Sequence, residues 1–191
     1  MSRSPTFGSN TEAFQAVTVI PIQYPSYSKL WYWGPALLIT AALCNGAAVK
    51  KPADRKPAPD FALPSASGGM VHLSDSKGKV VLLDFWATWC GPCRTETPWL
   101  IELSQKYKDQ GLAVIGVSMD DSWTPVKPYI AKANVPYTIL LGNDSLTPSF
   151  GTLDALPVAY FLDRQGRVAA THVGAGSRKQ FERIIEGLLS E

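Results

Sequence analysis

The apolar residues in the second half of the chain fall into short unbroken runs separated by longer segments of mixed polarity. The runs "KVVLLDFWA" (79–87) and "LAVIGVSM" (112–119) are typical of strands buried on both faces of a sheet. The stretches 158–163 and 167–173 are separated only by "RQG" and predict a β-hairpin. In chain order, the predicted strands are 71–73, 79–87, 112–119, 137–141, 158–163 and 167–173.

Helices are predicted between and after these strands. One begins near Cys90, continues to about Lys108 and ends before Gly111, a residue type common at helix ends. A second covers 125–133, and Ser177 is a suitable N-cap for a last helix. The apolar face of that last helix consists of Phe181, Ile184, Ile185, Leu188 and Leu189. Alternating strands and helices predict an α/β fold, a central sheet with helices on both faces, which the closing hairpin makes mixed.

The first 57 residues differ in pattern from the rest of the chain. We expect an N-terminal extension at 1–49, a linker at 50–57 and a folded domain at 58–191. The run "LWYWGPALLITAALCNGAAV" (30–49) carries no charge and has about the minimum length of a membrane-spanning helix. It also fits a secretory signal, in which an apolar run follows a basic residue and ends in small residues. The stretch "KKPADRKPAP" separates this run from the domain.

The extension predicts export, to the periplasm or the extracytoplasmic face of the membrane. The basic residues that follow the apolar run argue against simple export, because such flanks tend to stay in the cytoplasm. Membrane association would use 30–49 itself or a lipid on Cys44, although Cys44 is equally well one more apolar residue of the run. The length of chain upstream predicts a later translation start, near Val17 or Val19.

Composition and charge exclude several classes of function. The chain has 191 residues and a net charge of +2, too small to indicate nucleic acid as a partner. No glycine-rich phosphate loop is present in the sequence, and we expect no bound cofactor and no resident metal. Three cysteines are too few for a disulfide scaffold, and 46% hydrophobic residues suffice for a core. Cys90 and Cys93 are therefore available for chemistry.

These two cysteines lie directly after a buried strand and at the first turn of the predicted helix, within "DFWATWCGPCRTETP". Free N–H groups and the positive end of the helix dipole favour thiolate over thiol at that point. We therefore expect the pKa of Cys90 to lie below the ordinary value of about 8.5. The spacing to Cys93 places both sulfurs on one helix face, where they can form and reopen a small ring. Gly91 and Pro92 suit a first helical turn.

Other uses of the pair are less well supported. A zinc site needs four ligands, usually two such pairs, whereas the sequence holds one pair and two isolated histidines, His72 and His172. A structural disulfide over two intervening residues would restrict the unfolded chain little. Transfer of Cu(I) remains an alternative, with His172 as the third ligand. A thiol peroxidase is another alternative, although the Pro-x-x-x-Thr-x-x-Cys motif that surrounds a peroxiredoxin cysteine is absent.

The segment "DFWATWCGPC" resembles the active site of thioredoxins, and two longer stretches narrow the resemblance. "APDFALPSASGGMVHLSDSKGKVVLLDFWATWCGPCRTETPWL" and "LPVAYFLDRQGRV" are similar to the exported TlpA/ResA branch of that superfamily. The resemblance covers about 58–191 and implies a thioredoxin fold with an N-terminal β-hairpin and a central insertion at about 119–150. It also implies reduction of protein disulfides, with apocytochrome c among the candidate clients and a membrane thiol carrier as the reductant.

Two acidic residues flank the cysteines. Asp84 lies inside an apolar strand, where burial would raise its pKa and let its carboxyl take the proton of the second thiol. Thioredoxins are similar at this position, and the alternative is a strand-end aspartate facing solvent. Glu96 shares a helix face with Cys93, and the resemblance implies that it helps to set the thiol pKa values. The alternative is a solvated glutamate favoured by the helix dipole.

Residues around the cysteines are expected to bind the substrate. Trp89 is expected to be exposed beside the sulfur, where its ring can receive a substrate main chain, and Gly91 and Pro92 lie between the cysteines. The resemblance implies that the Leu156–Pro157 peptide bond is cis and lies opposite the cysteines. The main chain of Leu156 can then pair with an extended substrate. Directly after this proline the sequence has Val-Ala where the family often has Thr-Thr, which leaves the choice of substrate open.

Overall fold

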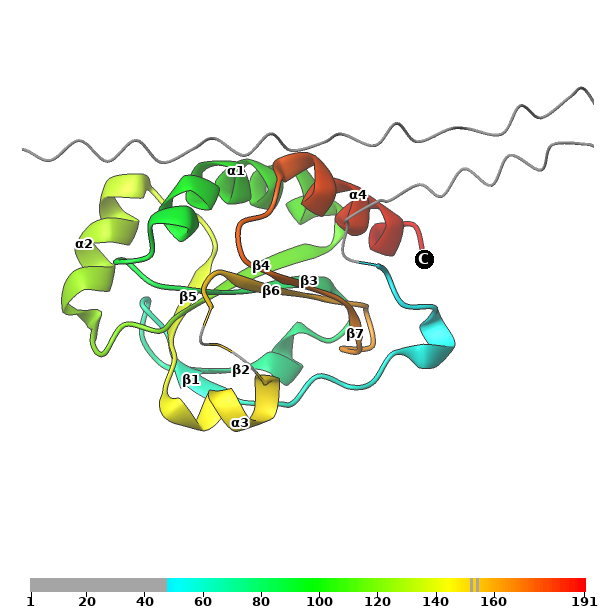
Figure 1. The fold of residues 1–191 in the computed structure, drawn as a ribbon, viewed down its shortest axis with the longest axis horizontal. Coiled ribbons are helices and arrows are strands. Elements are labelled where there is room, and N and C mark those ends of the chain that lie inside the picture. Colours follow the sequence, from blue (N-terminus) through cyan, green and yellow to red (C-terminus); the bar gives the residue numbers. More distant parts are fainter. Residues whose placement is uncertain (1–47, 152, 154) are drawn as a thin grey trace, which may run out of the picture. The chain divides into compact units, whose positions relative to one another are not determined.

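The computed structural model describes residues 48–151, 153 and 155–191, and its centre is a five-stranded mixed sheet of order β5-β4-β3-β6-β7 (Figure 1). Strands β3, β4 and β5 are parallel to one another, whereas β6 is antiparallel to both β3 and β7. The predicted mixed α/β fold is confirmed. The strands are β3 (Val80–Trp86), β4 (Leu112–Ser118), β5 (Thr138–Leu141), β6 (Val158–Leu162) and β7 (Val168–Val173).

The apolar run at 79–87 forms the central strand β3, in which every residue is buried. Val80 and Leu82 pack into the core on one face of the sheet, and Val81 and Leu83 pack into the core on the other. Burying one such aliphatic side chain contributes about 1.5–3 kcal/mol. Strand β3 therefore connects both halves of the core, and the residues that follow it are held in a fixed place.

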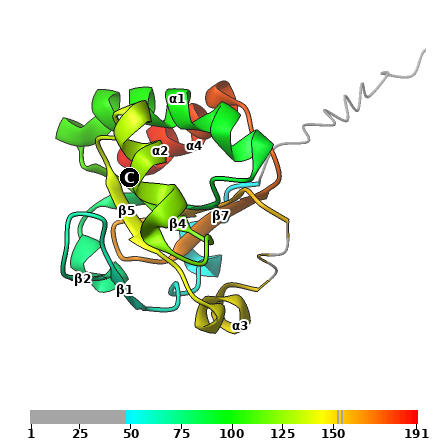
Figure 2. The ribbon, with the colours of Figure 1, turned by 90° about the vertical axis from the view of Figure 1, so that its left-hand side faces the viewer.

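Three helices cover one face of the sheet, as Figures 1 and 2 show. They are α1 (Gly91–Tyr107), α2 (Trp123–Ala133) and α4 (Arg178–Leu189). The predicted cap is confirmed for α4, because the side chain of Ser177 accepts the N–H of Gln180. Helix α2 begins two residues earlier than expected, since Ser122 caps it. The chain after α1 turns at Gly111, whose φ of 96° favours glycine.

The other face is covered by smaller elements. The hairpin implied by the family resemblance is present as antiparallel β1 (Ala62–Pro64) and β2 (Met70–His72), followed by the 3-10 helix η2 (Leu73–Ser76). The short helix α3 (Thr147–Phe150) completes this layer (Figure 1). Its Phe150 ring packs 5.2 Å from the ring of Phe85 on β3, centroid to centroid. Strand β1 and helix α3 are too short to show a periodic pattern, so the hairpin was expected from the resemblance alone and α3 was not predicted.

Residues 50–57, expected to form a linker, contact the closing hairpin of the sheet. The N–H of Lys50 donates to the carbonyl of Ala169 at 2.8 Å. The N–H of Val168 donates to the carbonyl of Lys56 at the same distance. These bonds place the segment along the outer side of β7.

A buried arginine fixes the same segment. The guanidinium of Arg55 contacts Asp163 at 3.3 Å and Glu191 at 2.5 Å. The residue is only 6% exposed, and its Nε also donates to the carbonyl of Lys50 at 3.0 Å. Because a buried charge is costly without partners, this cluster holds the segment, the β6–β7 turn and the C-terminal residue together.

The extension at 1–47, including Cys44 and nearly all of the apolar run, lies outside the residues that the structure describes. Within residues 48–151, 153 and 155–191, no helix has both the length and the apolar character needed to cross a membrane.

Candidate functional site

Cys90 and Cys93 form a disulfide at the N-terminus of α1, with their Cα atoms 5.3 Å apart. Cys90 is the N-cap residue, and its Sγ accepts the N–H of Cys93 at 3.2 Å. The helix dipole and this donor would stabilise a thiolate on Cys90 once the disulfide opens. Both cysteines are nearly buried, with 5% and 3% of their surface exposed. The geometry suits a pair that closes and reopens within one helical turn.

The turn between β3 and Cys90 is braced by a residue that the sequence patterns did not indicate. The carboxylate of Asp120 accepts the main-chain N–H of Thr88 at 2.9 Å and its hydroxyl at 2.6 Å. The hydroxyl of Ser118 donates to the same carboxylate at 2.7 Å. Asp120 lies after a different strand, so only the tertiary structure brings it to this turn. The braced turn fixes the entry into α1 and therefore the position of the first sulfur.

Asp84 lies in the middle of the sheet, with Gly116 on β4 and Ala159 on β6 as its cross-strand neighbours. It is 4% exposed, and its Oδ1 has no hydrogen-bond partner among the described residues. Burial, reinforced by the charge of Glu96, raises the pKa of Asp84 to about 8. The alternative of a solvent-facing aspartate does not apply. The carboxyl therefore keeps its proton at neutral pH and releases it at mildly alkaline pH.

Glu96 is also buried, with 2% of its surface exposed, at the third position after Cys93 on α1. Its Oε1 accepts the main-chain N–H of Gly176 at 2.6 Å. Burial raises the pKa of Glu96 to about 7, against the opposing effect of that hydrogen bond. The alternative of a solvated glutamate does not apply. Two buried carboxyls of raised pKa therefore interact with one another, one from the sheet and one from the helix that begins at the disulfide.

The Leu156–Pro157 peptide bond is cis, as the resemblance implied. Leu156 packs against the apolar cluster that contains both cysteines. Its main chain forms no main-chain hydrogen bond with other described residues, whereas the carbonyl of Pro157 accepts the N–H of Gly174 at 2.8 Å. An extended peptide can therefore pair with Leu156 directly beside the disulfide.

The rim of the site is exposed. Trp89 has 70% of its surface exposed, and Gly91 and Pro92 are exposed between the cysteines. Val173, the last residue of β7, is 57% exposed. It pairs with Val158, which directly follows the cis proline. The sequence patterns did not single out Val173, because its alternation in β7 is ordinary. Trp89, directly before Cys90 in the chain, thus adds exposed apolar surface next to the near-buried disulfide.

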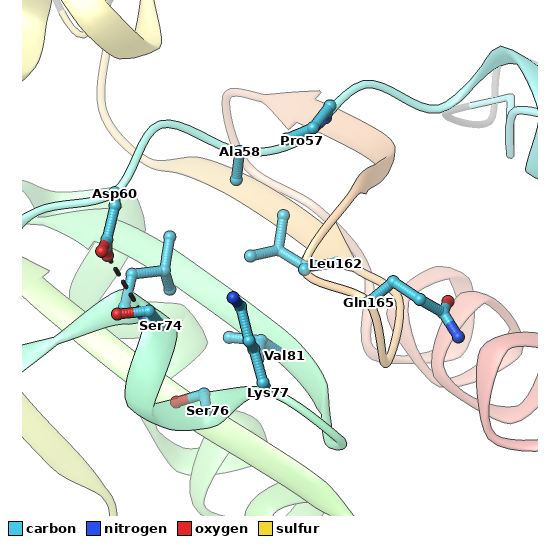
Figure 3. Close-up of a pocket in the computed structure, with 11 residues that line it drawn as sticks. Pro57, Ala58, Asp60, Ser74, Ser76, Lys77, Val81, Leu162 and Gln165 are labelled. Atoms are coloured by element: carbon cyan, nitrogen blue, oxygen red, sulfur yellow. Dashed lines mark hydrogen bonds between the residues drawn. The ribbon is translucent and has the colours of Figure 1, made fainter.

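A pocket of about 310 Å³ lies at the other end of the sheet and does not belong to this site. Figure 3 shows its lining, with Leu162 from β6 and Val81 from the start of β3 facing Lys77. The cysteines follow the far end of β3. The structure therefore separates this pocket from the disulfide by the length of the central strand.

No group of three or more potential metal-binding side chains occurs within the part of the chain that the structure describes. The two histidines lie apart in the fold. His72 is exposed at the end of β2, and His172 lies on β7 with its Nδ1 3.3 Å from the side-chain nitrogen of Gln180. The arrangement needed for the Cu(I) alternative, two sulfurs and His172 around one ion, is not found.

Comparison with known proteins agrees with this geometry. The model of the AhpC/TSA family matches residues 55–171. The thiol-disulfide oxidoreductase ResA of Bacillus cereus is 32% identical over 133 residues, which are 69% of this chain and 76% of that protein. The thioredoxin-like protein YneN of Bacillus subtilis is 36% identical over 132 residues, 68% of this chain and 76% of its own length.

Solved structures show the same architecture. A thiol:disulfide interchange protein of the thioredoxin family from Chlorobium tepidum superposes with a TM-score of 0.66 at 27% identity. The match covers 71% of this chain and 97% of that one. The five-stranded sheet and its helices are therefore those of a thioredoxin fold.

Proposed function

Because the chain belongs to the AhpC/TSA family and is a thiol–disulfide oxidoreductase of the ResA-like group, we propose that Cys90 and Cys93 are its redox-active dithiol and reduce disulfides in exported proteins. The observation that carries the proposal is their disulfide at a helix N-terminus, beside two buried carboxyls. Such a site supplies both a stabilised thiolate and nearby proton acceptors.

The reaction proceeds through a mixed disulfide. The Cys90 thiolate attacks one sulfur of the substrate disulfide, forms a new S–S bond and releases the other substrate sulfur as a thiolate. Cys93 gives its proton to ionised Glu96, or to Asp84 once mildly alkaline pH has ionised it, and attacks the Cys90 sulfur. The Cys90–Cys93 disulfide forms, and the second substrate sulfur leaves as a thiolate. The substrate gains two electrons, and the dithiol loses them.

The carboxyls suit this task because of their environment. A proton acceptor works best when its pKa lies near the operating pH. Burial brings the pKa of Glu96 to about 7 and that of Asp84 to about 8. We assign the proton of Cys93 to these groups, which lie on the buried side of the pair.

Substrate binding is assigned to the exposed rim. Trp89 receives the substrate main chain on one side, with Gly91 and Pro92 beside it, and Leu156, next to Pro157, pairs with an extended segment on the other. The domain acts outside the cytoplasm, held at the membrane by 30–49 or by a lipid on Cys44. A membrane thiol carrier returns two electrons to the disulfide after each turnover. Apocytochrome c, with its paired cysteines, is the candidate client.

Trapping tests the proposal directly. In a Cys93→Ala variant the mixed disulfide on Cys90 cannot resolve, so client proteins should remain covalently attached and be released by a reductant. Purified wild-type protein should reduce insulin disulfides with dithiothreitol as the electron source. The Cys90→Ala variant is the matched control and should trap nothing.

Two results would overturn the proposal. One is a wild-type protein that never reduces insulin, and the other is a Cys93→Ala variant that captures no more protein than the Cys90→Ala control. Rapid consumption of hydrogen peroxide by the Cys93→Ser form would instead favour the peroxidase alternative.

A further inference from the structure

Among the described residues, four buried side-chain polar atoms lack a hydrogen-bond partner. Two belong to Asp84 and Trp86 on β3, and the other two are Oε2 of Glu96 on α1 and Nε2 of His172 on β7. A buried polar group without a hydrogen-bond partner is destabilising, and most such groups in native proteins are paired. The Glu96 oxygen is an acceptor when the carboxyl is ionised, and the His172 nitrogen belongs to a ring that can donate a hydrogen bond.

The side chains of Glu96 and His172 border the same glycine. The N–H of Gly176 donates to the other carboxyl oxygen of Glu96 at 2.6 Å. A Cβ placed on Gly176 would lie 3.2 Å from Nε2 of His172. Without a side chain at this position, the imidazole of His172 and the carboxyl of Glu96 both lie against Gly176.

The hydrogen-bond partner of the other ring nitrogen indicates where the imidazole carries its proton. The side-chain nitrogen of Gln180 lies 3.3 Å from Nδ1 of His172. An amide nitrogen only donates, so Nδ1 accepts and the neutral ring carries its proton on Nε2. The ring also packs edge-on against Phe181, with the centroids 5.4 Å apart. In this tautomer His172 presents a buried N–H donor without a hydrogen-bond partner among the described residues.

The sheet places this donor on the same face as the carboxyls. Ala159 is the cross-strand neighbour of Asp84 on one side and of His172 on the other. Direct cross-strand neighbours point to the same face of a sheet, so Asp84, Ala159 and His172 share one face. Glu96 reaches this face from α1.

We propose that His172 is a positioning residue whose Nε2–H donates a hydrogen bond to the ionised Glu96 carboxylate and so sets the readiness of Glu96 to take the proton of Cys93. The proposal rests on the thiol–disulfide exchange proposed above. In the structure the pair is open, and closing it requires rotation about the last torsions of the Glu96 and His172 side chains, whose minima are broad and shallow.

The other groups that face His172 do not replace Glu96 as the acceptor. From α4 the ring meets Gln180 and Phe181, and neither titrates. Arg178, at the start of the same helix, pairs with Glu102 at 3.2 Å. From β3, Asp84 lies one strand beyond Ala159 and keeps its proton at neutral pH.

The test measures the titration of Glu96 by carboxyl ¹³C NMR in the reduced protein. His172→Phe keeps a planar ring and removes the donor, and should raise the Glu96 midpoint by about one pH unit, a tenfold gain in proton affinity. His172→Gln retains an N–H donor and should restore much of the wild-type midpoint. His72→Phe makes the same change at the exposed histidine on β2 and should leave the midpoint unchanged.

A second measurement needs no change at His172. The sequence contains two histidines, so His72→Gln leaves a single imidazole to observe. Its Nε2–H proton resonance should move downfield as Glu96 ionises, and Glu96→Gln should abolish this movement.

The outcomes separate this inference from the proposed function. The hydrogen bond is refuted if the Glu96 midpoints of wild type and His172→Phe are equal, or if the imidazole resonance does not shift when Glu96 ionises. Neither result would affect insulin reduction by the wild type. Failure of the wild type to reduce insulin would overturn the proposed function, whatever the NMR titrations show.

Discussion

The buried carboxyl of Asp84 should make the oxidised protein less stable as the pH rises. Its pKa is about 8 in the folded protein and 3.8 as its ordinary value, which the unfolded chain is expected to show. Between these values unfolding releases a proton, so the free energy of unfolding falls as pH increases. Below pH 3.8 both states hold the proton, and above pH 8 neither does, so the dependence is confined to this window.

Replacing Asp84 by Asn removes the ionisation at nearly constant volume. One pKa unit corresponds to about 1.36 kcal/mol, so three pH units, from 5 to 8, correspond to about 4 kcal/mol. The variant should therefore gain about 4 kcal/mol over wild type between these two pH values, beyond any constant difference. Glu96 is present in both proteins, and its own titration cancels to first order.

The assay is urea unfolding of the oxidised proteins at pH 5 and pH 8, followed by circular dichroism. Asp109→Asn makes the same substitution at an exposed position and is the matched control. If the stability difference between wild type and Asp84→Asn changes by less than about 1 kcal/mol over this range, the carboxyl ionises without a burial penalty. That result would refute the reasoning.

Three further substitutions test other contacts. Arg55→Met leaves buried Asp163 without its arginine partner, and the free energy of unfolding measured in urea should fall by about 3 kcal/mol. A variant as stable as wild type would contradict a structural ion cluster. Gly176→Ala forces a Cβ against the Phe181 ring and should cost about 1–3 kcal/mol, whereas Gly187→Ala, with open space around it, should cost nothing. Trp89→Ala, at a side chain 70% exposed, should keep stability within about 0.5 kcal/mol and raise the KM for insulin several-fold. An unchanged KM would exclude Trp89 from substrate binding.

Long apolar runs and helical periods were sufficient to predict the main elements. Runs such as 112–119 form β4, and the periodic face of the last helix is buried in α4. These patterns are local consequences of burying one face or both, so the sequence displays them directly. Elements of three or four residues, such as β1 and α3, carry too few positions for a period to appear.

The features of the site also divide into those that the sequence predicts and those that it does not. The helix start at Cys90 and the burial of Asp84 in an apolar strand follow from neighbouring residues alone. The carboxylate of Asp120 and the amide of Gly176 come to the site from distant parts of the chain, and neither residue has a local signal that marks its role. The segment 50–57 is another case. Its proline and lysine content indicates a linker, whereas Arg55 pairs with buried Asp163 and exposed Glu191, both more than 100 residues away.

By itself, the sequence determined the α/β pattern, the position of the dithiol at a helix N-terminus and an acidic residue on each side of it. The tertiary structure decided that both carboxyls are buried, that Leu156 packs against the cluster containing the cysteines, and that His172 and Glu96 both lie next to Gly176. The physical reason is that periodicity and helix-end chemistry act over a few residues. Desolvation and hydrogen bonding between strands and helices depend on which distant residues the packed sheet brings together.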